Sequence, residues 1–365
     1  MHNFNLTNLH QWFECDGVKF NNLYNGLDHS IDTQQYCFYH VDPFLIESLQ
    51  GIKRPKTDPS YIQSLMIKQL KKLRSEYEEI RLLYTGGTDS FTILKLAMDN
   101  GIYIDETITH LVSFTDDPKS NIEYLPGLQY AKQYENTLIG KVTTITPKIS
   151  DLDYLNTDRY YSNPNYVRGS VLWIRPVNVC QWLPTSNKKS ITLTGHEKPQ
   201  LIRQDGKLYW CMIDKPMDEF MDIPGIYHFF YDKNNPELMA AQIYATVDNI
   251  PNTSSRFISF SSYNTHERSN MIEKIGLFKT GRKYIDNALL GKGMHGRNIK
   301  NRRYIKELHK QGRSDIVDRI KQIHTELYNY YQIVDPNISL IDGISEMTGK
   351  FSEEKVLINQ DFLGA

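Results

Sequence analysis

The chain has 365 residues, with 42 lysines and arginines against 43 aspartates and glutamates, so its formal net charge is −1. This near-neutral charge excludes a protein that binds nucleic acid or an anionic membrane through its overall charge, although a local basic patch is compatible with it. Hydrophobic residues make up 40% and charged residues 23%, a composition that excludes disorder and predicts a globular protein of two or three structural units.

The four cysteines are Cys15, Cys37, Cys180 and Cys211, and no two of them form a Cys-x-x-Cys pair. The sequence therefore encodes no local disulfide framework, zinc motif or iron–sulfur motif, and a reducing compartment is expected. No apolar stretch approaches the roughly 18 residues of a membrane span. The first 15 residues also lack the apolar core of a signal peptide. We expect a cytoplasmic protein without membrane contact.

Residues 1–57 are aromatic and polar with no sustained period, which predicts a small N-terminal cap that is irregular or contains strands. From Asp58 onward apolar residues recur at three- and four-residue spacing, which predicts an amphipathic helix over residues 58–80. Asp58 is its expected N-cap, and Pro59 suits its first turn.

The next elements alternate between strand and helix. We predict strands over 80–84, 106–114, 141–145 and 190–194, and helices over 90–99 and 121–134, with Gly101 ending the first of these helices. Such alternation predicts an α/β fold, in which a parallel sheet is covered by helices on both faces. Ligands of such sheets bind at the carboxyl ends of the strands.

Beyond Gly195, residues 207–213 are predicted as one strand of a hairpin around Asp205-Gly206, and residues 235–249 as a helix. We take 58–250 as one α/β domain and 251–365 as a mainly helical C-terminal region. Residues 292–321 hold ten lysines and arginines against three acids. Two interpretations stay open for them: helices that pack on the core with basic side chains in water, or a surface that holds the phosphates of tRNA or DNA.

The most informative stretch is Thr85-Gly86-Gly87-Thr88-Asp89-Ser90, between the strand 80–84 and the helix that follows it. Adjacent glycines let consecutive N–H groups approach an anion, because no Cβ obstructs them. The hydroxyls of Thr85, Thr88 and Ser90 add donors, and the N-terminus of the helix favours phosphate. Asp89 would repel phosphate unless it holds a magnesium ion that bridges the phosphates. The spacing differs from that of the Walker loop.

This strand–loop–helix unit resembles the pyrophosphate loop of the N-type ATP pyrophosphatases, whose usual form is Ser-Gly-Gly-x-Asp-Ser, and Thr85 keeps the hydroxyl of the usual serine. The family includes asparagine synthetase, GMP synthetase, the tRNA-lysidine synthetase and the tRNA thiolases. The resemblance covers residues 60–215 and is strongest to the synthetase half of asparagine synthetase. It implies the fold of the adenine nucleotide alpha hydrolases and a requirement for ATP and Mg²⁺.

The resemblance also implies roles for residues near two other strands. Ser113-Phe114 would end the second strand, where the family binds adenine with backbone atoms. The strand 190–194 leads into Gly195-His196-Glu197-Lys198, where relatives place a turn beside the α-phosphate. Lys198 would stabilise negative charge on that phosphate, and Glu197 or His196 would take a proton from an incoming amine.

Lys292 and Arg297 lie in a glycine-rich basic stretch that would either bind the leaving pyrophosphate or form a flexible, solvated basic linker. The resemblance implies an AMP-forming ligase or amidating enzyme. An oxygen of a substrate carbonyl or carboxylate attacks the α-phosphorus of ATP, pyrophosphate leaves, and a nitrogen nucleophile then displaces AMP. The expected catalytic residues are Asp89, which is also the metal ligand, and the His196, Glu197 and Lys198 of the turn.

The sequence restricts the identity of the nucleophile more than that of the acceptor. The acceptor is a small molecule or a nucleic-acid base. Position 2 is His2, whereas the glutaminase part of asparagine synthetase needs a cysteine there, so we expect free ammonia, a substrate amine or a separate ammonia donor. The paired cysteines of the thiolases are missing, which disfavours sulfur transfer. Two alternatives stay open: an enzyme that adenylates a tRNA or DNA base, and a nucleotide-binding regulatory protein without turnover. The oligomeric state is left open.

Overall fold

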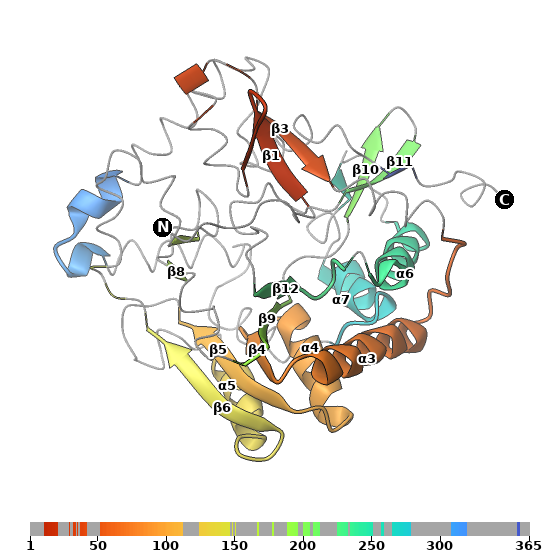
Figure 1. Ribbon diagram of the computed structural model, residues 1–365, viewed down its shortest axis with the longest axis horizontal. Helices are drawn as coiled ribbons and strands as arrows, with labels where there is room; N and C mark the ends of the chain where they lie inside the picture. Colours follow the sequence, from red (N-terminus) through yellow and green to blue (C-terminus); the bar gives the residue numbers. More distant parts are fainter. Residues whose placement is uncertain are drawn as a thin grey trace.

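The structure is a computed structural model (Figure 1). It describes residues 11–20, 29, 32, 33, 35, 37–41, 52–111, 124–146, 148, 150, 166–167, 177–178, 188–195, 200–204, 207–211, 225–232, 234–250, 257–258, 265–278, 308–319 and 356–357. None of the helices in these ranges is long and apolar enough to cross a membrane.

A five-stranded parallel sheet organises the fold and confirms the predicted α/β class. In chain order its strands are β4 (Glu79–Leu83), β5 (Ile104–His110), β6 (Ile139–Ile145), β9 (Ser190–Thr194) and β12 (Ile226–His228). They lie in the spatial order β12-β9-β4-β5-β6, and every neighbouring pair is parallel. The chain therefore builds outward from β4 to β6 and then returns to the other side of β4. The order of connection reverses between β4 and β9, and this reversal is where open α/β sheets bind their ligands.

The labelled helices are α3 (Pro59–Glu76), α4 (Thr88–Asp99), α5 (Leu125–Gln133), α6 (Pro236–Val247) and α7 (Thr265–Lys274), and residues 308–310 and 314–319 are also helical. The predicted helix over 58–80 was too long at its end. Tyr77 is extended, and the N–H of Glu78 donates to the Lys189 carbonyl at 2.8 Å, so the chain has already left the helix to enter the sheet. Asp58 is the N-cap by position, but its side chain makes no capping hydrogen bond.

The strand boundaries also differ from the prediction. The second strand runs from Ile104 to His110 rather than over 106–114, and residues 112–114 lie outside the described ranges. β12 was not predicted, because three residues are too few to show an alternating pattern. Gly101 does end α4: its φ is +64°, and the N–H of Ile102 reaches back to the Ala97 carbonyl at 2.8 Å.

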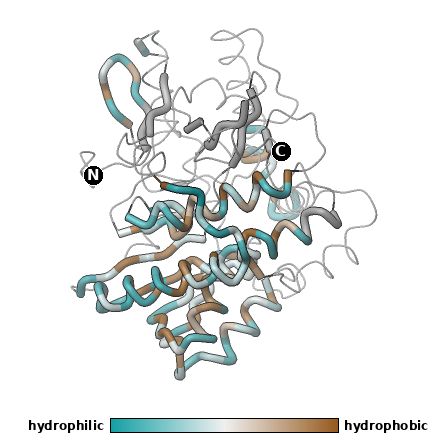
Figure 2. The backbone as a smooth tube through the Cα atoms, turned by 90° about the vertical axis from the view of Figure 1, so that its right-hand side faces the viewer, coloured by the Kyte–Doolittle hydropathy of each residue, from teal (hydrophilic) through white to brown (hydrophobic). Residues whose placement is uncertain are grey.

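One face of β4 and β9 is apolar and carries the main core. Ile80 and Leu82 of β4 lie beside Ile191 and Leu193 of β9, and these residues form one buried cluster with α3, α4, α6 and α7. Figure 2 shows hydrophobic and hydrophilic stretches alternating along the helices, as helices with one buried side require. This packing holds the first turn of α4 in a fixed position relative to β4.

The other face of β4 and β5 is mixed, because Leu83 and Ile108 are buried on it beside an ion pair. Arg81 of β4 pairs with Glu106 of β5 at 2.7 Å, and Glu106 accepts a hydrogen bond from Thr143 of β6 at 2.5 Å. Thr192 of β9 lies in register with Arg81 and is fully buried. The connections from β6 to β9 and from β9 to β12 lie largely outside the described residues, so a helical cover on this face stays a prediction.

A buried hydrogen-bond network joins α3, β12 and the start of α6. The Tyr227 hydroxyl donates to Asp232 at 2.5 Å, and the Gln69 amide donates to the Tyr227 oxygen at 2.7 Å and to the Phe229 carbonyl at 2.9 Å. Asn235, the N-cap of α6, donates to Gln69 at 2.8 Å. Burial raises the pKa of Tyr227, and the Asp232 carboxylate raises it further, so the phenol stays protonated as the donor.

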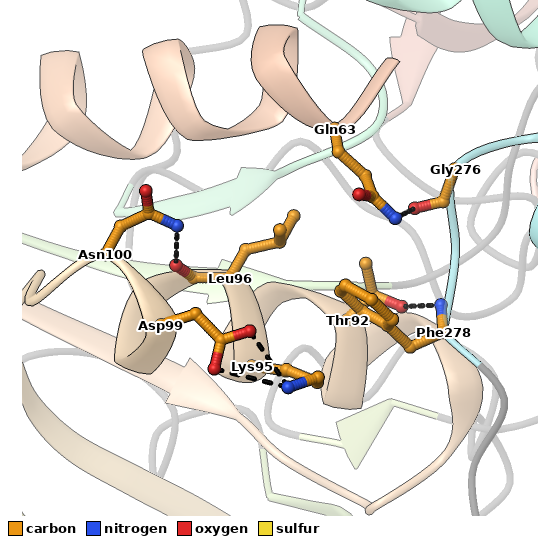
Figure 3. Close-up of polar contacts among 8 residues, drawn as sticks. All are labelled: Gln63, Thr92, Lys95, Leu96, Asp99, Asn100, Gly276 and Phe278. Atoms are coloured by element: carbon orange, nitrogen blue, oxygen red, sulfur yellow. Dashed lines mark hydrogen bonds and ion pairs between the residues drawn. The ribbon is translucent and has the colours of Figure 1, made fainter. Parts of the chain in front are cut away.

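Residues 265–278 return to the core. The segment after α7 contacts α3 and α4: Gln63 donates to the Gly276 carbonyl at 3.2 Å, and the N–H of Phe278 donates to the Thr92 hydroxyl at 2.9 Å (Figure 3). The Lys95 ammonium lies 5.2 Å from the centre of the Phe278 ring. Residues 265–278 thus pack with the α/β core, while the predicted domain boundaries stay predictions.

Smaller antiparallel sheets complete the described fold. The N-terminal sheet has the order β2-β1-β3, with β1 (Gln11–Cys15), β2 (Val18–Phe20) and β3 (Cys37–Val41), as expected of a cap that contains strands. The predicted hairpin around Asp205-Gly206 is confirmed by β10 (Gln200–Gln204) and β11 (Lys207–Cys211). The remaining short strands are β7 (Tyr166–Val167), β8 (Val177–Asn178), β13 (Phe257–Ile258) and β14 (Val356–Leu357).

We predict that Thr92→Val destabilises the protein by about 1–3 kcal/mol, because it removes the acceptor of the Phe278 N–H without changing the side-chain shape. Denaturant unfolding measures this change. Ser75→Ala on the exposed side of α3 is the control and should change stability by less than about 0.5 kcal/mol. Equal losses of stability in the two variants would show that the Thr92–Phe278 bond does not hold the segment after α7 against α4.

Candidate functional site

The glycine loop leaves the sheet at the carboxyl end of β4, beside the reversal of strand order. Two bonds hold this exit: the N–H of Tyr84 donates to the Ile108 carbonyl at 2.7 Å, and the Thr109 hydroxyl donates to the Tyr84 carbonyl at 2.6 Å. β5 therefore fixes where the loop begins. The carboxyl end of β9, at Thr194, is the neighbour on the other side.

Gly86 makes the closest backbone contact of the loop. Its φ is +67°, in the left-handed region, and a Cβ placed on it would lie 2.9 Å from the Cα of Gly127 in the first turn of α5. A Cβ on Gly127 would lie 2.6 Å from the Cα of Gly86. The two backbones touch, so neither position accepts a side chain without movement.

The hydroxyls of Thr85 and Ser90 close the loop on itself. The Ser90 oxygen accepts the N–H of Thr85 at 3.2 Å, donates toward the Gly87 carbonyl at 3.4 Å and lies 3.4 Å from the Thr85 hydroxyl. The N–H of Gly87 donates to the Thr85 hydroxyl at 3.3 Å. Ser90 is buried, so these two side chains shape the loop from inside rather than extending from it.

The second half of the motif belongs to α4 rather than to a loop. Gly87 is the N-cap and has no side chain to cap the helix, while Thr88, Asp89 and Ser90 form the first turn. N–H groups of a first helical turn have no acceptor within the helix, and they carry the positive end of its dipole. Asp89 is half-buried in this turn. The predicted helix therefore starts two residues earlier than expected.

Gly195 packs against this first turn from the β9 side. A Cβ on Gly195 would lie 2.8 Å from the nitrogen of Ser90 and 3.0 Å from the carbonyl carbon of Asp89. The structure thus brings together seven predicted residues, which come from the loop after β4, the first turn of α4 and the position after β9: Thr85, Gly86, Gly87, Thr88, Asp89, Ser90 and Gly195.

The other predicted site residues are not placed. Ser113, Phe114, His196, Glu197, Lys198, Lys292 and Arg297 all lie outside the described residues. Within the described ranges no group of three or more His, Cys, Asp or Glu side chains could hold a metal ion. Asp89 is therefore the one predicted metal ligand that the structure positions.

Two residues of the site were missed by the sequence analysis. Gly127 stands in Leu-Pro-Gly-Leu, which carries no phosphate-loop signal of its own, and only the fold shows its contact with Gly86. Tyr84 ends the strand run, and its ring lies in the core below the loop. Burial raises the pKa of Tyr84, and its buried hydroxyl finds no hydrogen-bond partner among the described residues. Its large aromatic side chain, at the end of an apolar run, could have been assigned only to the core.

No protein-family model matches the chain, and no curated protein sequence matches it.

We predict that Gly86→Ala destabilises the protein more than Gly101→Ala does. The two glycines have φ of +67° and +64°, but a Cβ on Gly101 would meet nothing within 4 Å. Gly101→Ala therefore reports the left-handed backbone alone, about 1–2 kcal/mol. Gly86→Ala adds the collision with Gly127, about 1–3 kcal/mol more. Denaturant unfolding of both variants measures the difference, and an equal loss would contradict a tight contact between the loop and α5.

Proposed function

We propose that the protein is an ATP-dependent, AMP-forming ligase or amidating enzyme that adenylates a carbonyl or carboxylate oxygen and then transfers a nitrogen nucleophile. The observation that carries this proposal is the position of the Thr85–Ser90 segment. It joins the carboxyl end of β4 to the N-terminus of α4 where the strand order reverses, with Gly195 of the neighbouring strand packed against it. These features support a site for a phosphate chain.

The loop supplies donors suited to a pyrophosphate group. The side chains of Thr85 and Ser90 are engaged within the loop, so the backbone N–H groups of the first turn of α4 are the donors that face a ligand. Gly86 and Gly87 carry no Cβ, which lets a phosphate approach the backbone closely. Such a contact recognises the charge and shape of phosphate rather than any particular base.

Asp89 fits a magnesium ion that is shared with the nucleotide. Mg²⁺ keeps several waters and takes one or two carboxylates together with phosphate oxygens, so a single positioned carboxylate is the expected protein contribution. The ion would neutralise charge on the phosphates next to the first turn of α4.

Residues after β9 complete the proposed chemistry. Gly195 touches the first turn of α4, and His196, Glu197 and Lys198 follow it directly in the sequence. We propose that Lys198 stabilises negative charge on the α-phosphate and that Glu197 or His196 accepts the proton of the attacking amine. In the first step the new bond joins the substrate oxygen to the α-phosphorus and the bond to pyrophosphate breaks; in the second, nitrogen displaces AMP.

The test is the product of ATP turnover across a panel of carboxylic acids, amides and nucleobases, each with ammonium present. We expect AMP and pyrophosphate to form with one member of this panel. Asp89→Asn should lower that rate by about 100-fold or more, because the variant loses charge stabilisation in the phosphate site. Asp99→Asn, at the other end of α4 and paired with Lys95, is the matched control and should keep the rate within about twofold.

Three results would contradict the proposal. Formation of ADP and phosphate would place the attack at the γ-phosphorus, and an Asp89→Asn variant as active as the wild type would remove Asp89 from the site. Tight ATP binding without turnover on any acceptor would favour a nucleotide-binding regulatory protein. Thermal unfolding of both variants separates these outcomes from a loss of fold.

A further inference from the structure

The N-terminal sheet places two cysteines directly opposite each other. Cys15 is the last residue of β1 and Cys37 is the first residue of β3, and the antiparallel register pairs them. The same register runs through the whole of β1, from Gln11 opposite Val41 to the cysteine pair. Residues opposed in this way lie on the same face of the sheet, so the two cysteines are neighbours although they are distant in sequence.

The turn after Cys15 determines whether Cys15 and Cys37 form a hydrogen-bonded or a non-hydrogen-bonded pair. Asp16 and Gly17 have φ of +51° and +73°, as the two central residues of a type I′ hairpin turn require, and they join Cys15 to Val18. The residues that flank a two-residue turn exchange their hydrogen bonds with each other. The N–H and C=O of Cys15 therefore face β2, and Cys15–Cys37 is a non-hydrogen-bonded pair across β1 and β3.

Non-hydrogen-bonded pairs bring opposite residues closest. Their Cα atoms lie about 4.5 Å apart, and disulfides span Cα separations of roughly 4.4–6.8 Å. The strand register therefore meets the distance requirement for a disulfide without a change in strand pairing.

The thiol of Cys15 is held at the entrance to β3. It is buried and free, its sulfur donates to the Gln35 carbonyl at 3.6 Å, and it lies 3.8 Å from the Thr33 hydroxyl. Thr33 is itself fixed by a bond of 2.8 Å to the His29 carbonyl. Gln35 stands two residues before Cys37, so the sulfur is already at the segment that leads to the opposing cysteine.

We propose that Cys15 and Cys37 are a redox-sensitive pair that closes to a cross-strand disulfide by exchange with a low-molecular-weight disulfide. One cysteine thiolate attacks a sulfur of the small disulfide, which releases one small thiol and leaves a mixed disulfide. The other thiolate then attacks the protein sulfur of that mixed disulfide and displaces the second small thiol. The protein pair loses two electrons, the small disulfide gains them, and the two thiol protons end on the two released thiols.

Closure would tie the β1–β2 hairpin to β3. A cross-link between these residues restricts the unfolded chain, so the oxidised N-terminal sheet is more resistant to unfolding than the reduced one. The reaction is reversible by a small thiol. It does not depend on the proposed ligase activity, because neither cysteine belongs to the loop or to α4.

Peptide mapping of the native full-length protein tests the pairing. The protein is incubated with oxidised glutathione, alkylated and digested with trypsin without reduction. Cleavage after Lys19 and Lys53 puts the two cysteines on peptides 1–19 and 20–53. We expect these peptides to be joined and two hydrogens lighter than their sum, while the peptides that carry Cys180 and Cys211 stay unlinked to them.

The same oxidation in guanidinium chloride is the control, because an unfolded chain pairs its four cysteines without guidance from the strand register. Joined 1–19 and 20–53 peptides in the native protein, against a mixture of pairings in the unfolded one, support the proposal. An identical mixture in both, or native peptides that remain unlinked, overturns it.

Thermal unfolding provides a second measurement. Oxidation should raise the melting temperature of the wild type by several degrees, and a small thiol should reverse the shift. Cys37→Ser should melt at one temperature with or without oxidant, whereas Cys211→Ser should keep the wild-type shift. A shift that survives in Cys37→Ser would assign the effect to another thiol and overturn the proposal.

Discussion

The close backbone approach at the carboxyl end of β4 is the constraint on which the candidate site depends. Gly86, Gly127 and Gly195 come from three separate segments, and a Cβ on any one of them would lie less than 3.0 Å from backbone of another. Without side chains between them, the loop, the first turn of α5 and the end of β9 pack backbone against backbone. The N-terminus of α4 is thereby held from two sides at the point where the strand order reverses.

That contact needs a rigid support, and β4 provides it through two different faces. Ile80 and Leu82 pack into the apolar core under α3 and α4, a non-directional contribution that fixes the helix layer on the sheet. Arg81, on the opposite face, pairs with Glu106 of β5. A half-buried ion pair adds little net stability but disfavours any register that leaves one charge unpaired. The apolar face of β4 thus holds the layers together, and the Arg81–Glu106 pair on its other face favours the observed alignment of β4 with β5.

The sequence predicted the elements whose signals are local. The alternation of apolar runs and amphipathic helices predicted four of the five parallel strands, β4, β5, β6 and β9, together with α3 to α6, and the Gly-Gly loop was located from its composition. The predicted helix ran too far into residues 77–80, and the predicted strand too far into residue 111, because strand and helix ends depend on partners such as the Lys189 carbonyl. Asp16-Gly17 is a local hairpin signal in the sequence, and the predictions for residues 1–57 did not include a hairpin there. The Gly86–Gly127 and Cys15–Cys37 neighbours had no local signal, since only the packing of α5 and the register of β1 and β3 bring them together.

The charge at the start of α4 makes a further demand on any ligand of the loop. Asp89 already places a carboxylate in the first turn, where it interacts favourably with the positive end of the helix dipole. A phosphate that binds the same N–H groups brings a second anion to the same pole, and the two repel across a half-buried site. Removing the carboxylate would relieve that repulsion and would strengthen binding of a bare anion. A divalent cation between the carboxylate and the phosphate reverses the sign of the effect, so that Asp89 strengthens binding instead. Removal of the Asp89 carboxylate would therefore strengthen nucleotide binding at an anion site and weaken it at a metal–nucleotide site.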